Sequence, residues 1–456
     1  MKRFTVTVVG LGEVGSVFSE ALASVDHHVY GFDPFTDVTP TGVERVHALA
    51  DCVGGSDAVL VATSASTAVR IAADVAPFAH DRLTYIDLNA AHPDIKRQVQ
   101  ALLPEKTHLV DGAILGSIRK FGARARILLS GAETSEAVAL LDTLGGEVEV
   151  VGEQVGDAST MKLVRSAFMK TLGASIVEAI DAGRELDVES WVRGEIAREL
   201  TDGAAGAERL YDGTRTHAVR RSVEATAAAD LLTSRGIDAT MASATARKTA
   251  ISGLEVNSGG ALSELGSLPV ANVGDALDRH TGILPPQISR RSGEGIVVGR
   301  ALTIECTAGS NDALHRALQI ARSGDFLVVS ARTTPDRAML GELIGFRSQA
   351  AGVVGLIVDG AIRDVDDLQQ AGISTWSTAV TPAGPYKTSG GHVGRPIAIG
   401  SVVIQTGDIV VADDDGIMVL APTDVPDAAA GARRVADEEQ RRRASITGAI
   451  AHSSED

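Results

Sequence analysis

Short β-branched runs alternate with helix-like stretches over the first third of the chain. The runs expected to form strands are residues 4–9, 28–32, 58–62, 84–88 and 126–130. Strands separated by helices form βαβ units, so this alternation predicts a parallel sheet with helices on its faces. We therefore expect an α/β domain over residues 1–155.

From Gly156 to Gly253 the pattern changes to helix with few strand signals. Apolar residues recur at steps of three or four at Met161, Val164, Phe168, Leu172 and Ile176. This period predicts an amphipathic helix with one buried face, within an all-α domain over residues 156–253.

Residues 254–268 are rich in Gly and Ser and lack sustained periodicity, which is typical of a linker. Strand-like runs resume at residues 295–299, 326–330, 352–360, 397–404 and 408–412. Because glycines bound these runs and few long helices separate them, we expect another domain over residues 269–425. A helix and a disordered polar tail are expected over residues 426–456.

The composition narrows the classes of function. The 456 residues carry 42 Lys and Arg against 59 Asp and Glu, a net charge of −17, and 3% are aromatic. Such a chain is a poor partner for nucleic acid or an anionic membrane. No apolar run approaches the ~18 residues of a membrane-spanning helix. The start MKRFTVTVV is expected to be a strand rather than a signal peptide, and Cys52 and Cys306 need form no disulfide, so we expect a cytoplasmic protein.

A glycine-rich motif follows the first strand and opens a helix. It consists of Gly10, Leu11, Gly12, Glu13, Val14 and Gly15. In a GxGxxG turn the first glycine permits the tight bend, the second lets the backbone approach a pyrophosphate, and the third permits close helix–sheet packing. The alternative is a glycine-rich turn in some other α/β sheet.

Asp33 closes the second strand at the position where an acidic residue binds the adenosine ribose. Its carboxylate would accept hydrogen bonds from the ribose hydroxyls and repel a 2′-phosphate. No Arg or Lys follows it in the segment GFDPFTD. The motif therefore favours NAD over NADP.

The first ~250 residues resemble the 6-phosphogluconate and 3-hydroxyacid dehydrogenase superfamily. The resemblance rests on the motif GLGEVG and on residues 111–117 and 156–162. The resemblance implies a Rossmann domain, a helical domain and oxidation of a hydroxy acid. It also implies that Lys162, on the first long helix after the Rossmann domain, holds the substrate hydroxyl and shuttles its proton. Burial and a nearby cofactor charge would lower the pKa of such a lysine. The alternative is a solvated helix lysine.

Two positions depart from that family. Ser166 stands where the family has Asn, four residues after the lysine, and Leu115 stands where a serine binds the substrate carboxylate. The version KLVRSAFMK resembles a subgroup of phosphogluconate-dehydrogenase-like proteins with an atypical helical domain. Arg165 and Ser166 are then the candidates for substrate binding. The alternative is a Rossmann domain that binds NAD without catalysis.

A second motif joins Glu342, Leu343 and Ile344 with Arg363 and Asp364. In the setting GELI…GVVGLIVDGAIRD, with further matches at residues 272–277, 381–387 and 407–420, it resembles the RraA-like family. That family includes class II aldolases acting on 4-hydroxy-4-methyl-2-oxoglutarate. The resemblance implies a swivelling β/β/α domain that assembles as a trimer or hexamer.

Mg²⁺ or Mn²⁺ held by Asp364 would act there as a Lewis acid on a 2-oxo acid. Arg363 would bind the 2-oxo oxygen or a carboxylate, and the N–H groups of Leu343 and Ile344 would bind the C1 carboxylate. Glu342 would relay a proton. The alternative for the pair Arg363–Asp364 is an exposed pair of charges.

Together these resemblances predict a multifunctional fusion: an NAD-dependent hydroxyacid dehydrogenase and a metal-dependent aldolase or decarboxylase that releases pyruvate. Its partners would be a hydroxy acid, a 2-oxo acid and further copies of itself, with dimers forming through the helical domain. The alternative is that the C-terminal domain is a module that binds and inhibits a ribonuclease. Three features have plain explanations: the run 413–416 as a hairpin turn, Cys306 as a core residue, and Glu438 and Glu439 as a solvated helix face rather than carboxylates lent to a neighbouring subunit.

Overall fold

A computed structural model describes residues 2–256, 260–277, 282–307, 309–331 and 336–453. The chain divides into two compact units, Met1–Ala174 and Ser175–Asp456. Each unit is described by itself.

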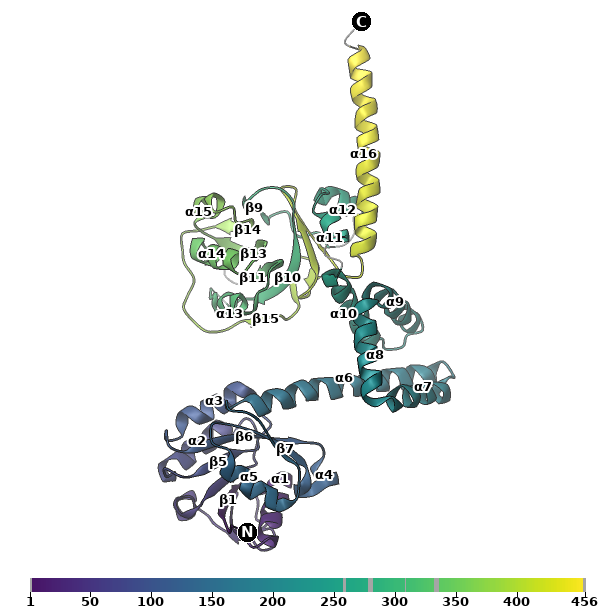
Figure 1. Cartoon of the computed structure of the whole chain (residues 1–456). Helices are drawn as coiled ribbons and strands as arrows, with labels where there is room; N and C mark the ends of the chain where they lie inside the picture. The colour runs from purple at the N-terminus through teal and green to yellow at the C-terminus, as the bar shows by residue number, and fades with distance from the viewer. Residues whose placement is uncertain (1, 257–259, 278–281, 308, 332–335, 454–456) are drawn as a thin grey trace. The chain divides into compact units, whose positions relative to one another are not determined.

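The first unit is built on an eight-stranded sheet with the order β3-β2-β1-β4-β5-β6-β7-β8 (Figure 1). The strands are β1 (Thr5–Val9), β2 (His28–Phe32), β3 (Glu44–Arg45), β4 (Ala58–Val61), β5 (Thr84–Asp87), β6 (His108–Leu115), β7 (Arg126–Ser130) and β8 (Val148–Gly152). Neighbours are parallel except β6 and β7. The predicted Rossmann sheet is confirmed.

Helices α1 (Glu13–Ser24), α2 (Ala68–Val75), α3 (Pro93–Leu102), α4 (Ile118–Phe121) and α5 (Ser135–Leu141) connect these strands. The central strands are buried on both sides, as parallel strands between helices are. Two cores result: Phe18 and Leu22 of α1 pack in one, and Ile71 of α2 and Val99 of α3 pack in the other.

Strand β6 holds most of the segment 111–117 on which the dehydrogenase resemblance partly rests, since Asp111 to Leu115 belong to it. Leu115 is buried and packs with Leu128 and Ala158. It therefore lies in the core rather than at a substrate site.

The helical region comprises α6 (Asp157–Glu185), α7 (Glu189–Thr201), α8 (Gly203–Thr216), α9 (Ala218–Ser234) and α10 (Thr240–Val256). The expected buried face of α6 is only partly found. Met161, Val164 and Phe168 are 47%, 68% and 62% exposed. The helix is amphipathic in sequence, but within the first unit its apolar side is exposed at these three positions.

The second unit also holds a nine-stranded sheet whose main path is β19-β18-β10-β11-β13-β14-β9. Its strands are β9 (Ser289–Ser292), β10 (Val297–Glu305), β11 (Asp325–Ser330), β12 (Ala338–Leu340), β13 (Gly355–Ile362), β14 (Thr375–Val380), β15 (His392–Val393), β18 (Ile409–Ala412) and β19 (Ile417–Leu420). Strands β10, β11, β13 and β14 run parallel. The run expected at 397–404 is a hairpin of β16 (Ile397–Ile399) and β17 (Val402–Ile404).

Helices α13 (Asp312–Ile320), α14 (Glu342–Ala350) and α15 (Val365–Gln370) connect the parallel strands. Their apolar residues share one core with the strands, for example Leu314 of α13, Ile344 of α14 and Leu368 of α15. Trp376 of β14 lies in a second core with the β16–β17 hairpin. Together these cores hold the loops that follow β12 and β13 in place.

The segment expected to be a linker is largely structured. Residues 257–259 lie outside the described residues, but α11 (Ala261–Leu265) and α12 (Val270–Ala276) follow. Leu265 and Leu268 are buried in a third core together with Val425, at the start of α16 (Val425–Ser453). Helix α16 extends beyond the expected helix, and the end of the expected disordered tail, residues 454–456, is not described.

Two expectations about loops and cores are confirmed. Residues 413–416 form the turn between the antiparallel strands β18 and β19, where Asp413 N donates to Gly416 O. Cys52 and Cys306 are free and buried, and burial raises the pKa of the Cys306 thiol to about 12. In the described part of the chain, no helix combines the length and apolar character needed to cross a membrane.

Candidate functional site

The glycine-rich turn between β1 and α1 has the shape that a dinucleotide needs. A methyl group on Gly15 would overlap the carbonyl oxygen of Gly10, whose φ is +92°, whereas a methyl group on Gly12 would meet nothing within 4 Å. Gly15 therefore permits close packing, and Gly12 leaves open space at the start of α1. A pocket of about 350 Å³ lies there, lined by Gly10, Gly12, Glu13, Val14 and Asp33 among others.

Asp33 follows β2 and faces this pocket. Its two carboxylate oxygens accept the N–H groups of Leu11 and Phe35, each at 2.8 Å. Two cations lie near: Arg70 of α2 lines the pocket itself, and Arg45 of β3 donates through its guanidinium to the backbone carbonyls of Asp33, Thr36 and Val38. Arg45 is thus engaged with the loop after β2.

Lys162 and Ser166 lie one turn apart on α6, on the same helix face. Lys162 is half-buried, and its pKa is lowered first by burial and then by the positive charge of Lys96, while Asp111 opposes the shift. Ser166 accepts a hydrogen bond from Lys170 at 3.3 Å. Arg165 is exposed.

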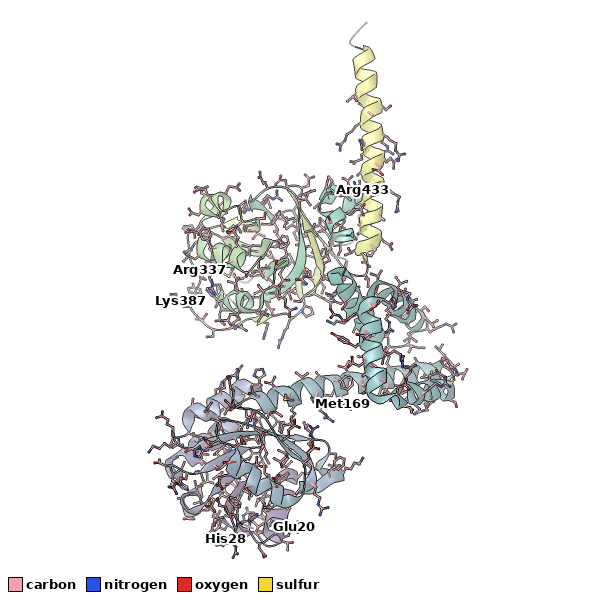
Figure 2. The ribbon with its side chains drawn as sticks, in the orientation of Figure 1. Glu20, His28, Met169, Arg337, Lys387 and Arg433 are labelled. Carbon is pink, nitrogen blue, oxygen red and sulfur yellow. The ribbon has the colours of Figure 1, made fainter. Side chains whose placement is uncertain are left out.

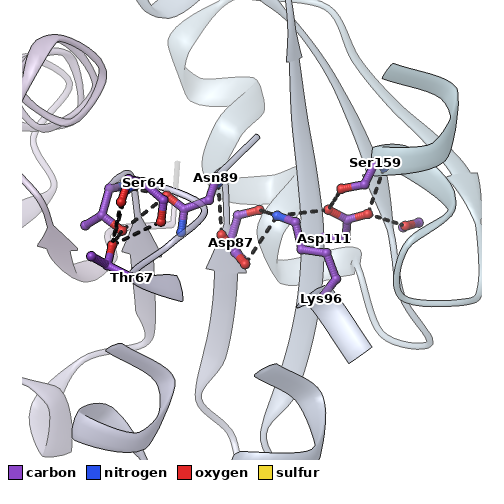
Figure 3. A network of polar contacts seen from close by, with 9 residues as sticks. Ser64, Thr67, Asp87, Asn89, Lys96, Asp111 and Ser159 are labelled. Atoms are coloured by element: carbon purple, nitrogen blue, oxygen red, sulfur yellow. Dashed lines mark hydrogen bonds and ion pairs between the residues drawn. The ribbon is translucent and has the colours of Figure 1, made fainter. Parts of the chain in front are cut away.

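The sequence did not point to Lys96, a second lysine whose charge lowers the pKa of Lys162. Lys96 of α3 is fully buried between Asp87 at the end of β5 and Asp111 in β6 (Figure 3). The sequence contains one weak indication that Lys96 is buried. Lys96 precedes Val99 by three residues and so shares the apolar face of its helix.

In the second unit, a pocket of about 610 Å³ lies where β12 and β13 end. Its lining includes Gly341, Leu343, Ile344, Arg363 and Asp364. Five of the residues predicted from the sequence motif or adjoining it are therefore brought together. Glu342 is not among the lining residues.

Gly341 allows Arg363 and Asp364 to approach the start of α14. A methyl group on Gly341 would overlap the Asp364 carboxylate and lie 2.9 Å from Cγ of Arg363. Asp364 adopts a left-handed backbone with φ of +56°, and its Oδ2 accepts the N–H of Glu342 at 3.2 Å. The same oxygen lies 3.3 Å from Nε of Arg363. Asp364 thus joins the two loops of the pocket.

The first turn of α14 offers backbone donors. Because the first N–H groups of a helix have no partner within it, those of Leu343 and Ile344 are available at the pocket. The side chain of Leu343 is 74% exposed.

Further polar residues line the pocket: His315, which no matched segment contains, and residues of the segment 381–387, which the RraA-like resemblance included. His315 of α13 lines the pocket and lies 2.9 Å from a guanidinium nitrogen of Arg347. Tyr386 and Lys387 come from the segment after β14, and Tyr386 OH accepts from Arg337 at 2.9 Å. Figure 2 labels Arg337 and Lys387 on the same side of this domain. Sequence spacing could not relate these segments, because α13 and residues 384–389 lie far apart in the chain.

The carboxylates expected on α16 are occupied within this chain. Glu438 pairs with Arg442. Glu439 pairs with Arg443 and accepts from Asn272 at 3.3 Å.

Three families match the chain in succession. Residues 5–152 match the NAD binding domain of 6-phosphogluconate dehydrogenase. Residues 184–250 match a domain of unknown function, DUF1932. Residues 270–419 match the family described as Aldolase/RraA.

Among similar proteins, one from Halalkalibacterium halodurans, assigned as a 4-hydroxy-4-methyl-2-oxoglutarate aldolase, is 32% identical over 184 residues, 40% of this chain and 87% of that protein. A solved Streptomyces coelicolor member of the RNase ES inhibitor RraA family is 26% identical, covering 41% of this chain and 96% of that chain with a TM-score of 0.36. A conserved protein of unknown function, described as similar to 3-hydroxyacid dehydrogenases, is 27% identical, covering 55% of this chain and 98% of that chain with a TM-score of 0.38.

Proposed function

The chain belongs to the Aldolase/RraA family and joins that domain to an NAD-binding domain of the 6-phosphogluconate dehydrogenase type, and from this premise we propose a bifunctional enzyme. The N-terminal unit would oxidise a hydroxy acid with NAD. The C-terminal domain would cleave or decarboxylate a 2-oxo acid and release pyruvate. The observation that carries the second activity is the convergence of Arg363, Asp364 and the start of α14 on one pocket.

The N-terminal site fits NAD, since Gly12 leaves room for a pyrophosphate and α1 presents free N–H groups and a positive dipole end to it. NAD is favoured over NADP because the Asp33 carboxylate, which faces the pocket, would accept hydrogen bonds from the ribose hydroxyls and repel a 2′-phosphate. NAD, when bound, accepts a hydride. The neutral amine of Lys162 takes the proton of the substrate hydroxyl, and Ser166 on the same helix face binds the substrate.

In the C-terminal pocket the chain stabilises the negative charge that develops as pyruvate leaves. The N–H groups of Leu343 and Ile344 bind the C1 carboxylate at the start of α14. Arg363 holds the 2-oxo oxygen with its guanidinium. Glu342, the first residue of α14, would relay a proton from outside the pocket lining.

A divalent cation fits this pocket through one protein ligand. Within the described ranges, no three His, Cys, Asp or Glu side chains come together as a metal cluster. Mg²⁺ keeps several waters and often takes only one or two carboxylates. Asp364, whose Oδ1 has no hydrogen bond in the described structure, would hold Mg²⁺ or Mn²⁺, which supplies Lewis acidity toward a 2-oxo acid.

The chain would assemble with further copies of itself. Each unit exposes large apolar side chains on its helices: Val164 and Phe168 in the first unit, and Val177, Trp191, Leu200, Tyr211 and Val223 in the second. Exposed apolar side chains in such numbers are typical of a surface that binds another protein. A second copy would cover it, and the C-terminal domain would form the trimer or hexamer that its family resemblance implies.

The decisive experiment measures pyruvate release from oxaloacetate and from 4-hydroxy-4-methyl-2-oxoglutarate, with Mg²⁺ and with EDTA. We expect release that EDTA stops and that Asp364→Ala abolishes. Asp366→Ala is the matched control, because Asp366 is exposed on α15 and does not line the pocket. Equal rates in Asp364→Ala and wild type would contradict the proposed C-terminal activity.

The second candidate is a regulatory module, favoured by the position of Glu342 away from the pocket lining. In that case neither substrate is cleaved with any divalent cation, and the full-length protein inhibits a ribonuclease. A dehydrogenase half that binds NAD without catalysis would show NADH binding but no turnover across a panel of hydroxy acids.

A further inference from the structure

Lys96 is the centre of a buried charge cluster. Its side chain is completely buried, and Nζ donates to the backbone oxygen of Asp87 at 2.8 Å. Nζ also lies 3.2 Å from Asp87 Oδ2 and 3.1 Å from Asp111 Oδ1, and both carboxylates are as buried as the lysine. A buried lysine is retained only where its charge is paired, so the two aspartates determine its position.

Asp111 connects this charge cluster to α6 through hydrogen bonds. Its Oδ1 accepts the hydroxyl of Ser159 at 2.7 Å, and its Oδ2 accepts the N–H of Ser159 at 2.9 Å (Figure 3). Ser159 lies in the first turn of α6, three residues before Lys162 and on the same face. The carboxylate that anchors the helix therefore also acts on the Lys162 amine, whose pKa its negative charge raises.

The charges of the cluster decide which lysine Asp111 pairs with. Lys96 makes the direct ion pair with Asp111, whereas Lys162 makes none in the described structure. If Lys96 were absent, the uncompensated Asp111 would attract the ammonium form of Lys162. An amine held in that form cannot take a proton from a substrate hydroxyl.

We propose that Lys96 is an electrostatic positioning residue for Lys162: it neutralises Asp111, so that Asp111 anchors α6 without capturing the Lys162 amine. This inference rests on the proposed role of Lys162 as the proton acceptor. Lys96 touches neither substrate nor cofactor and acts only through Asp111. The directions of the pKa shift of Lys162, downward from Lys96 and upward from Asp111, agree with it.

The elements that carry this cluster hold further charged or titratable groups, and none of them acts on the pKa of Lys162 as Lys96 and Asp111 do. From β5 come Asp87, already bound to Lys96, and Tyr85, whose pKa burial raises. From α3 comes Arg97, which pairs with Asp94. From α6 itself comes Asp157, which accepts from Gln154 N.

The test uses the full-length protein and a variant that keeps the buried charge balanced. Lys96→Met alone would leave two buried carboxylates unpaired and destabilise the fold. Lys96→Met combined with Asp87→Asn removes one positive and one negative charge together. Asp87→Asn alone keeps Lys96 beside Asp111, and Lys106→Met removes a lysine that is 72% exposed.

The readout is the titration of the Lys162 amine, followed by NMR after isotope-labelled reductive methylation and assigned by its loss in Lys162→Arg. We expect the midpoint to move to higher pH in Lys96→Met/Asp87→Asn and to stay unchanged in both control variants. The kcat/KM for NAD reduction at pH 7 should fall about tenfold and recover at higher pH. A structural defect would lower the rate equally at every pH.

An unchanged midpoint in the folded double variant would overturn the inference. The titration needs neither substrate nor turnover, so the two proposals fail separately. A moved midpoint without dehydrogenase activity supports the positioning role and contradicts the proposed function. Turnover with an unchanged midpoint supports the proposed function and contradicts the positioning role of Lys96.

Discussion

Gly12 and Gly15 stand three residues apart and have opposite surroundings. A side chain on Gly15 would overlap the backbone of Gly10, whereas one on Gly12 would point into open space beside the candidate NAD pocket. Substitutions at the two positions should therefore distinguish the stability of the turn from its capacity to bind NAD.

We expect Gly12→Ala to keep the melting temperature of the wild type and to weaken NADH binding about tenfold, because the methyl group occupies pyrophosphate space. Gly15→Ala should lower both, since overpacking costs about 1–3 kcal/mol. Differential scanning fluorimetry and NADH fluorescence titration distinguish the two effects. Tight NADH binding by Gly12→Ala would contradict the assigned pyrophosphate position.

Gly341 makes the corresponding test in the C-terminal domain. Gly341→Ala places a methyl group against Asp364 and Arg363, so we expect at least about a hundredfold loss of metal-dependent pyruvate release. Gly274→Ala is the control, because a methyl group there meets nothing within 4 Å. Retained release in Gly341→Ala would show that the approach of these two side chains is unimportant for activity.

The pKa of Lys162 also gives a pH prediction. Burial and Lys96 lower this pKa below its ordinary 10.5. The neutral amine is the active form for hydroxyl oxidation, so the rate of NAD reduction should rise with pH and reach its plateau below pH 10.5. A pH profile of kcat/KM measures this rise. A rate that falls over the same range would assign the proton transfer to another group.

At the scale of elements, α6 exposes Met161, Val164 and Phe168, which belong to no hydrophobic core among the described residues of the first unit. A helix period alone states which residues share a face, but it does not state which molecule covers that face. The period therefore predicted that Met161, Val164 and Phe168 share one stripe of α6, but within the first unit these side chains are exposed.

We expect Val164→Glu/Phe168→Glu to convert the full-length protein to a smaller assembly, measured by light scattering after size-exclusion chromatography. The introduced charges cannot be buried in an apolar interface without a large cost. Phe78→Glu, at a position 38% exposed in the first unit, should leave the mass unchanged. Identical masses for all three proteins would show that another surface forms the assembly.

At the scale of the whole molecule, local patterns were the reliable part of the sequence. All five strands expected in the first unit are present, and the glycine turn lies where GLGEVG placed it. Strand β6 was not among the expected strands, because Asp111 and Gly112 interrupt its apolar run. The burial of Lys96 could not be predicted, since it depends on two aspartates from separate strands.

The two buried cysteines allow the unfolding of each unit to be measured in the intact chain. Cys52 is in the first unit and Cys306 in the second. A thiol reagent applied in short pulses along a denaturant series would add one mass increment for each unit that opens. Increments at separate denaturant concentrations would measure the stability of each half in the intact fusion, without a truncated protein or an engineered probe.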